Sequence, residues 1–93
     1  MSWVNVYVHV VFSTKNWYPY LNKEIRAKVF EHIKENAKLK GIKINEINGY
    51  TDHCHCLIFL SKEQSLARTI QLIKGESSYW INKVKLTEKH FKW

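Results

Sequence analysis

Alternating apolar and polar positions at the start of the chain predict a β-strand over residues 4–12. Every second residue from Val4 to Phe12 is apolar. These side chains would share one face and pack into a core, because successive side chains of a strand point to opposite faces. The other face carries an unusual set for a water-exposed strand: Trp3, Asn5, Tyr7, His9 and Val11. We therefore expect a half-buried strand with aromatic and imidazole groups on its outer face.

Two later stretches have the apolar spacing of amphipathic helices. In the first, Asn22 is a typical N-cap residue and Gly41 a typical helix-ending residue. Its apolar positions are Ile25, Val29, Phe30, Ile33 and Ala37. The second helix is expected to begin at Ser61 or Ser65. Its predicted buried stripe is Leu66, Ile70, Ile73, Ser77 and Ile81.

Two more strands are predicted between these helices. The first is marked by Ile42, Ile44, Ile47 and Tyr50, with Asn48-Gly49 as a turn or bulge signal. The second covers residues 52–60 and follows so closely that an antiparallel hairpin is expected. Phe91 and Trp93 stand at strand spacing and allow a final strand over residues 87–93.

This order predicts an α+β fold, specifically a ferredoxin-like βαββα(β) sandwich. Its antiparallel sheet would carry both helices on one face. Right-handed crossovers place the strands over residues 4–12 and 52–60 side by side in the middle of the sheet. A chain of 93 residues is expected to form a single domain over residues 1–93.

The stretch from Asp52 to Cys56 concentrates two histidines and two cysteines on one predicted strand. His53 and His55 would share the outer sheet face, and Cys54 and Cys56 the core face. One tetrahedral zinc ion therefore cannot reach both pairs. Free cysteines are common in cores, which is the simpler interpretation of Cys54 and Cys56.

Two imidazoles at neighbouring positions of one face can bind a divalent metal such as Mg²⁺, Mn²⁺ or Zn²⁺. His9 and Asp52 are the local candidates for a further ligand. Alternatively, both histidines are surface residues that hydrogen-bond to their neighbours. The spacing alone leaves both interpretations open.

The charge balance favours a polyanionic partner. The chain has 15 Lys and Arg against 8 Asp and Glu, a net charge of +7, so nucleic acid is the leading candidate. Lys74, beside Gly75 and Ser77, is a candidate phosphate contact. No membrane span or signal peptide is indicated, and two cysteines in one strand are poorly placed for a disulfide, which favours the cytoplasm.

Four segments, in order, resemble the single-tyrosine HUH transposases. This family includes the insertion sequence 200-like and the REP-associated tyrosine transposases. The matching segments are His-Val-Val-Phe-Ser-Thr-Lys at 9–15, Ile-Asn-Gly at 47–49, Asp-His-Cys-His-Cys-Leu-Ile at 52–58 and Ile-Lys-Gly-Glu-Ser-Ser-Tyr-Trp-Ile-Asn at 73–82. The resemblance spans essentially the whole chain.

The resemblance implies an enzyme that acts as a homodimer on single-stranded DNA, at hairpin ends, and joins DNA through a 5′-phosphotyrosine. It implies that His53 and His55 bind Mg²⁺ or Mn²⁺. The DNA-binding candidates are Trp3, Tyr7 and His9 on the outer sheet face, with Lys15 and Lys74 in the matching segments.

In such enzymes the nucleophilic tyrosine and a further metal ligand, commonly glutamine, lie on a helix beyond a segment resembling residues 90–93. We therefore expect no catalytic nucleophile within residues 1–93, and a domain that lacks the family's C-terminal helix. Tyr79 does not occupy the nucleophile position. The expected dimer would form through strand edges or through the tail that carries Phe91 and Trp93.

Two other functions are compatible with the sequence. One is a non-catalytic module that binds single-stranded or hairpin nucleic acid, in which Trp3, Tyr7 and Phe59 stack on bases. The other is a small interaction or metal-sensing module in which the histidines are structural.

Overall fold

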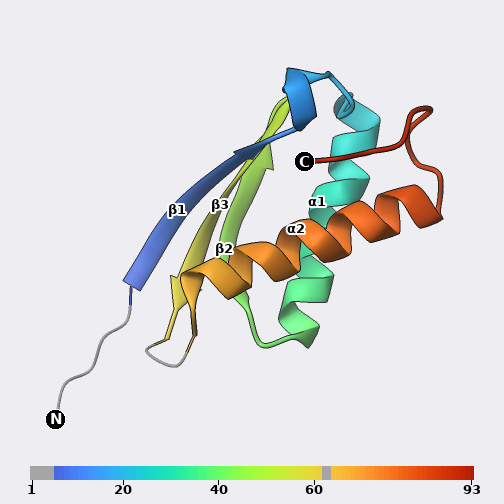
Figure 1. The fold of residues 1–93 in the computed structure, drawn as a ribbon. Helices are drawn as coiled ribbons and strands as arrows, with labels where there is room; N and C mark the ends of the chain where they lie inside the picture. The colour runs from blue at the N-terminus through green and yellow to red at the C-terminus, as the bar shows by residue number, and fades with distance from the viewer. Residues whose placement is uncertain (1–5, 62–63) are drawn as a thin grey trace, which may run out of the picture.

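The computed structural model describes residues 6–61 and 64–93 and has two layers (Figure 1). A three-stranded antiparallel sheet forms one layer, and two helices cover one face of it. In chain order the elements are β1 (Val6–Ser13), the short 3-10 helix η1 (Lys15–Trp17), α1 (Lys23–Leu39), β2 (Lys43–Gly49), β3 (His53–Leu60) and α2 (Leu66–Lys83). The predicted α+β fold is confirmed. Trp3, Val4 and Asn5 lie outside the described residues.

The strands lie in the order β1-β3-β2, so the histidine strand β3 is in the middle. The predicted pairing of the first strand with β3 is confirmed: Val10 lies opposite Cys56, and Phe12 opposite Cys54. In the part of the chain that the structure describes, β1 is an edge strand, not a central one, because no strand forms after α2.

Both helices begin at capping side chains. The Asn22 side chain accepts a hydrogen bond from the Ile25 N–H at 2.9 Å, and that of Ser65 accepts one from the Arg68 N–H at 3.3 Å. Gly41 follows α1 with a φ of 72°, a conformation that favours glycine. Ser65, and not Ser61, therefore starts the second helix. Neither helix is long and apolar enough to cross a membrane, among the residues described.

A single core lies between the sheet and the helices. It joins Val10 and Phe12 of β1 to Val29, Ile33 and Ala37 of α1, the inner side chains of β3 and Ile73 and Ile81 of α2. Two predicted core positions are wrong. Val6 is 44% exposed, because the first end of β1 extends past the helices in Figure 1, and Leu66 is 37% exposed while Thr69 is buried in its place.

A β-bulge explains the irregular spacing of isoleucines in β2. The pairing with β3 shifts register between Ile44 and Glu46, so one residue is inserted. This insertion keeps Ile44 and Ile47 packed against the same core although they are three positions apart. Asn48-Gly49 is not the turn: Gly49 is inside β2, opposite Cys54, and the bulge lies earlier.

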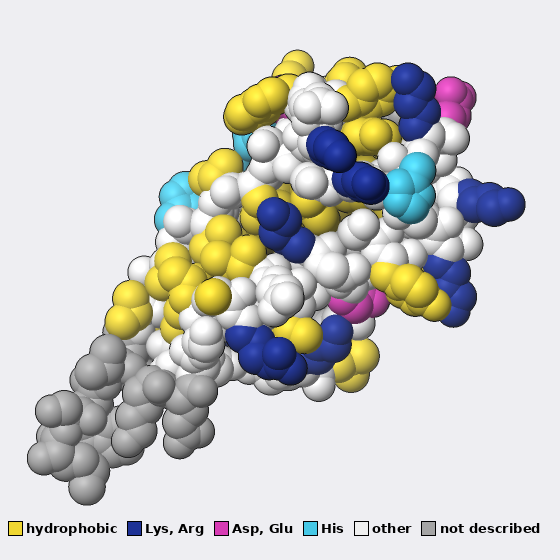
Figure 2. Space-filling model, in the orientation of Figure 1, with side chains coloured by type: hydrophobic (Ala, Val, Ile, Leu, Met, Phe, Trp, Pro, Cys, Tyr) yellow, Lys and Arg dark blue, Asp and Glu magenta, His cyan; other side chains and the backbone are white. Residues whose placement is uncertain are grey.

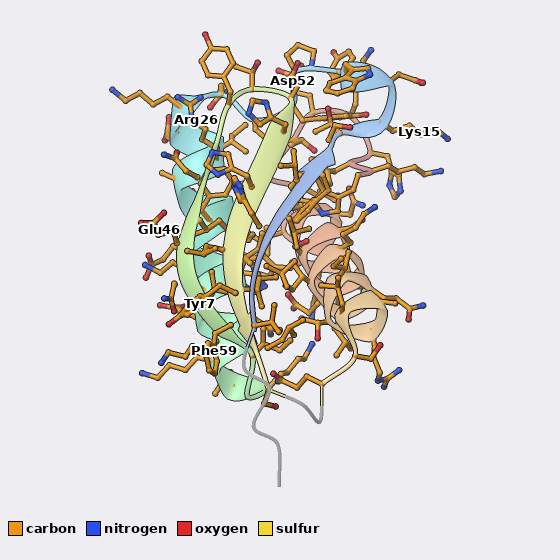
Figure 3. All side chains as sticks on the ribbon, turned by 90° about the vertical axis from the view of Figure 1, so that its left-hand side faces the viewer. Tyr7, Lys15, Arg26, Glu46, Asp52 and Phe59 are labelled. Carbon is orange, nitrogen blue, oxygen red and sulfur yellow. The ribbon has the colours of Figure 1, made fainter. Side chains whose placement is uncertain are left out.

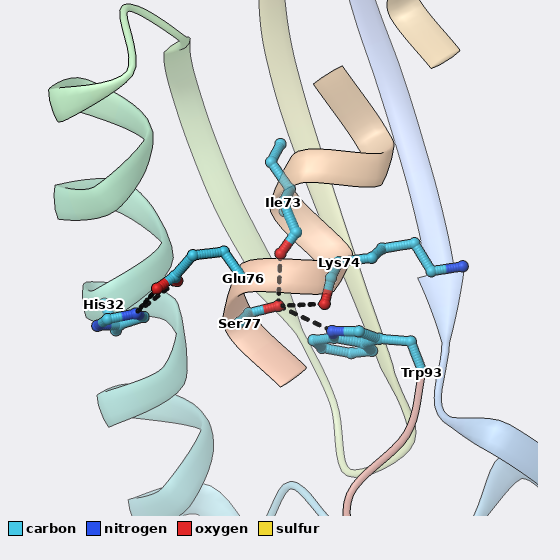
Figure 4. Close-up of polar contacts among 6 residues, drawn as sticks. All are labelled: His32, Ile73, Lys74, Glu76, Ser77 and Trp93. Atoms are coloured by element: carbon cyan, nitrogen blue, oxygen red, sulfur yellow. Dashed lines mark hydrogen bonds and ion pairs between the residues drawn. The ribbon is translucent and has the colours of Figure 1, made fainter. Parts of the chain in front are cut away.

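The predicted final strand does not form, and residues 87–93 return to the core as an irregular tail. Phe91 is fully buried. Asn82 holds its backbone in place of a strand partner: the Asn82 side chain accepts the Phe91 N–H at 2.7 Å and donates to the Phe91 carbonyl at 3.0 Å. Trp93 packs edge-on against Phe12 and donates its indole N–H to Ser77 Oγ at 2.9 Å (Figure 4).

A polar contact joins the two helices. His32 Nε2 of α1 donates to Glu76 Oε1 of α2 at 2.7 Å (Figure 4). The His32 ring also stacks on Trp80, with centroids 3.9 Å apart and planes 7° from parallel. The pair fixes how α1 and α2 pack on the far side of the sheet from the histidines of β3.

Gly49→Ala is expected to destabilise the fold by about 1–3 kcal/mol, because a Cβ on Gly49 would collide with the backbone oxygen of His53 and press on Phe30. Gly75→Ala is the matched control. Nothing lies within 4 Å of a Cβ built at that helix position, and the substitution should stabilise by about 0.5–1 kcal/mol. Urea unfolding measures both, and equal stability of the two variants would contradict the packing at Gly49.

Candidate functional site

Strand β3 separates two kinds of chemistry, as the alternation predicts. Cys54 and Cys56 are fully buried beneath the helices. His53 and His55 are half-buried on the opposite face, which the helices leave uncovered. The predicted division into a cysteine face and a histidine face is confirmed.

The two cysteines are core residues. Their sulfur atoms are 3.9 Å apart, both thiols are free, and neither side chain reaches solvent. The hydrogen bond with Cys56 and burial in the core both raise the pKa of the Cys54 thiol well above its ordinary value. A neutral buried thiol is neither a good nucleophile nor a good metal ligand.

Each histidine of β3 contacts a different neighbour through the same ring nitrogen. His53 Nδ1 lies 3.0 Å from Asp52 Oδ1. His55 Nδ1 lies 3.5 Å from Nε2 of His9 on β1, and these two rings meet edge-on at 86°. The rings of His53 and His55 are 6.2 Å apart and only 23° from parallel.

The donor set fits part of a divalent-metal site. Two neutral imidazoles on one face are suitable ligands, and waters or phosphate oxygens commonly complete such a site. Within residues 6–61 and 64–93 no group of three His, Cys, Asp or Glu side chains surrounds one point. The interpretation of His9 or Asp52 as a further ligand is therefore not supported; each contacts a histidine instead.

The DNA-binding candidates fall into separate places. Tyr7 and His9 lie on the histidine face, and Tyr7 is 56% exposed. Lys15 is exposed in η1, at the Asp52 end of the sheet (Figure 3). Lys74 is on α2, in the helical layer, so the sheet separates it from His53 and His55. Trp3 is outside the described residues.

An aromatic cluster that the sequence only partly indicated lies at the other end of the same face. Tyr7 and Phe59 meet edge-on with ring centroids 5.1 Å apart, and Lys43 Nζ lies 5.4 Å from the Phe59 centroid. Lys43 was not a sequence candidate. Its place on this face depends on the bulge in β2, which simple alternation does not reveal.

The outer sheet face carries fewer Lys and Arg side chains than we expect of a surface that binds nucleic acid. Its cations lie around it: Lys43 is at the Phe59 end, and Lys15 and Arg26 are at the Asp52 end (Figure 3). Glu46 of β2 lies between those ends. Lys and Arg side chains are instead spread over the helical side of the molecule, without forming one patch (Figure 2).

The tyrosines provide no clear nucleophile beside the histidines. Tyr79 is 65% exposed on α2, in the layer opposite the histidine face. The Tyr20 hydroxyl donates to the His90 carbonyl at 3.0 Å. Tyr50 is exposed beneath the Arg26 guanidinium, whose carbon is 5.4 Å from the ring centroid.

Comparison with known proteins relates this chain to one family and to solved structures. The model of the family described as "Transposase IS200 like" matches residues 2–93. A crystal structure from Deinococcus radiodurans R1, described as a "putative transposase", has a TM-score of 0.79 and 17% sequence identity. The alignment covers 90% of this chain and 63% of that one, so this chain spans less than two thirds of its structural neighbour. No curated protein matches the sequence significantly.

Cys54 and Cys56 are expected to react with a thiol reagent on the order of 100-fold more slowly in the native protein than in denaturant. Because both thiols are buried, the reagent can reach them only when the core opens transiently. Following the release of thionitrobenzoate with and without urea measures both rates. Rapid labelling of the native protein would place a cysteine at the surface and contradict the assigned face.

Proposed function

The chain belongs to the family of IS200-like transposases, and from this premise we propose that it is a metal-dependent DNA-processing domain that acts on single-stranded DNA. His53 and His55 hold Mg²⁺ or Mn²⁺ on the outer sheet face. The observation that carries the proposal is the placement of both imidazoles, half-buried and side by side, on the one sheet face that no helix covers.

The chemistry of this face fits a phosphodiester. A divalent ion held there would withdraw charge from the scissile phosphate and stabilise the leaving oxygen. Lys15 and Arg26 lie at the same end of the sheet as Asp52 and can neutralise neighbouring phosphates (Figure 3). His53 and His55 would be the protein ligands that hold this ion at the phosphate.

The aromatic cluster supplies a surface for an unpaired base. Tyr7 is exposed against Phe59, and the Lys43 ammonium is close by. Bases of single strands stack on such rings without sequence preference, and cations beside them attract the backbone. We propose that one DNA strand crosses this face from the cluster towards the histidines.

The proposal assigns the nucleophile to none of the tyrosines described above. Tyr79 is in the wrong layer, and the other tyrosines make contacts typical of packing or base stacking. Residues 1–93 are proposed to supply metal and DNA binding.

The assembly is proposed to be a homodimer formed through strand edges. In the described part of the chain, β1 has a hydrogen-bonded neighbour on one side only. The alternative route through the tail is disfavoured, because Phe91 is fully buried in the core of its own chain.

A non-catalytic single-strand binding module is the second candidate. The exposed Tyr7–Phe59 pair is the observation that favours it, because base stacking needs no metal. The two functions differ in one measurable property, which is whether the histidine face binds a divalent ion.

Removing either histidine, by His53→Ala or His55→Ala, is expected to weaken Mn²⁺ binding. Loss of a residue that only hydrogen-bonds to a metal ligand lowers metal affinity by about 10–100-fold, and loss of a ligand itself should lower it further. Isothermal titration and Mn²⁺ electron paramagnetic resonance measure the affinity. His90→Ala, which removes an exposed imidazole from the tail, is the control and should bind as the parent does. Unchanged affinity in both strand variants, with the fold intact by circular dichroism, would reject the metal site.

Tyr7→Ala is expected to weaken binding of a single-stranded oligonucleotide by about 5–150-fold, from a stacking energy of roughly 1–3 kcal/mol per base. Tyr79→Ala is the matched control, since it removes a tyrosine of similar exposure from the opposite layer. Fluorescence anisotropy at several salt concentrations measures affinity, which should fall as salt rises. Equal losses in both variants would argue against DNA on the histidine face.

A further inference from the structure

A histidine can bind a metal only through a ring nitrogen that carries a free lone pair. In the neutral ring one nitrogen bears the proton and the other is the acceptor, and either tautomer can form. A pair of ligands is therefore preorganised only if something fixes both tautomers and both ring orientations. His53 and His55 each need a neighbouring side chain that can do this.

Asp52 fixes the tautomer of His53. Its Oδ1 atom is 3.0 Å from His53 Nδ1. An ionised carboxylate can only accept a hydrogen bond, so Nδ1 must carry the proton and donate it. The lone pair of the neutral ring is then on Nε2. Both side chains are about one third exposed.

His9 has the equivalent position beside His55. It lies on β1, diagonally across the sheet, since its direct partner in β3 is Leu57 and the partner of His55 is Val11. Its Nε2 atom is 3.5 Å from His55 Nδ1, a long contact, with the two rings at 86°. If His55 donates through Nδ1 and His9 accepts, the His55 lone pair is also on Nε2.

The two contacts come from different elements, and only the contact with Asp52 fixes a tautomer by itself, because His9 can either donate or accept. Both engage Nδ1, and among the described residues no hydrogen bond reaches Nε2 of either ring. The two rings are also 23° from parallel. We propose that Asp52 and His9 are positioning residues, which hold His53 and His55 as Nδ1–H tautomers so that both present Nε2 to the metal.

This inference rests on the proposed function, but its first test needs no metal. Long-range ¹H–¹⁵N correlation spectra of the metal-free protein, at a pH where histidine is neutral, report which nitrogen of each ring carries the proton. His53 and His55 are both expected as Nδ1–H tautomers. A dominant Nε2–H form of either ring in the parent protein would overturn the assignment for that ring.

Variants separate positioning from simple packing. Asp52→Ala should convert His53 to a mixture of tautomers without affecting His55, and His9→Ala should do the reverse. Asp52→Asn is the conservative variant, because its amide oxygen still accepts from Nδ1, and it should retain the Nδ1–H form of His53. Unchanged spectra in the two alanine variants would overturn the proposal.

The effect on the metal is measured next. Asp52→Ala and His9→Ala are each expected to lower Mn²⁺ affinity by about 10–100-fold, with Asp52→Asn closer to the parent. Glu46→Ala is the matched control for charge: it removes an exposed carboxylate from a neighbouring strand of the same sheet and should change affinity little. An equal loss of Mn²⁺ affinity in Glu46→Ala and Asp52→Ala would show that affinity depends only on the negative charge near the site. That result would overturn the positioning role of Asp52.

Three further outcomes show whether this inference, the proposed function or only the role of His9 fails. If the metal-bound spectrum places the ion on Nδ1 of His55, then Nδ1 does not donate to His9 and the positioning role of His9 is wrong. If the parent protein binds no divalent ion while the tautomers still follow Asp52 and His9, the proposed function fails and the contacts are structural. If the tautomers ignore both residues while Mn²⁺ binds through His53 and His55, only this inference fails.

Discussion

The structure depends on β3 being a central strand with two different faces. Because β1 and β2 both pair with it, its backbone hydrogen bonds are satisfied on both sides and its register is fixed by two ladders. Burial of Cys54, Cys56 and Ile58 under the helices then forces the intervening histidines outward. A shift of the strand register by one residue would bury both imidazoles and expose the cysteines. The register that forms the core therefore also places the two histidines on the outer face.

The opposite layer is completed by the tail and not by a further strand. Phe91 enters the core, and Asn82 satisfies its backbone N–H and carbonyl groups, as a neighbouring strand would otherwise do. Trp93 extends this packing to Phe12 of β1, one register position from His55's partner Val11. The tail therefore supports the strand that also carries His9.

The outer face divides into a histidine end and an aromatic end. His53 and His55, with Asp52 and His9 beside them, occupy one end, and Tyr7 with Phe59 the other. Both ends lie along the same two strands, β1 and β3. The DNA strand that we propose for this face would contact both ends at once.

The sequence by itself determined the period of each element, and through it the α+β fold, the β1–β3 pairing and the separation of histidines from cysteines. These follow from local rules of alternation, capping and apolar spacing. The tertiary structure decided the features that depend on contacts between elements. The spacing of Phe91 and Trp93 suits a strand, yet a side-chain amide 9 residues earlier holds the tail in the core. His9 meets His55 across 46 residues of sequence, and the β2 bulge sets the place of Lys43 on the face. Each depends on a tertiary contact, whose geometry exists only once the layers have packed.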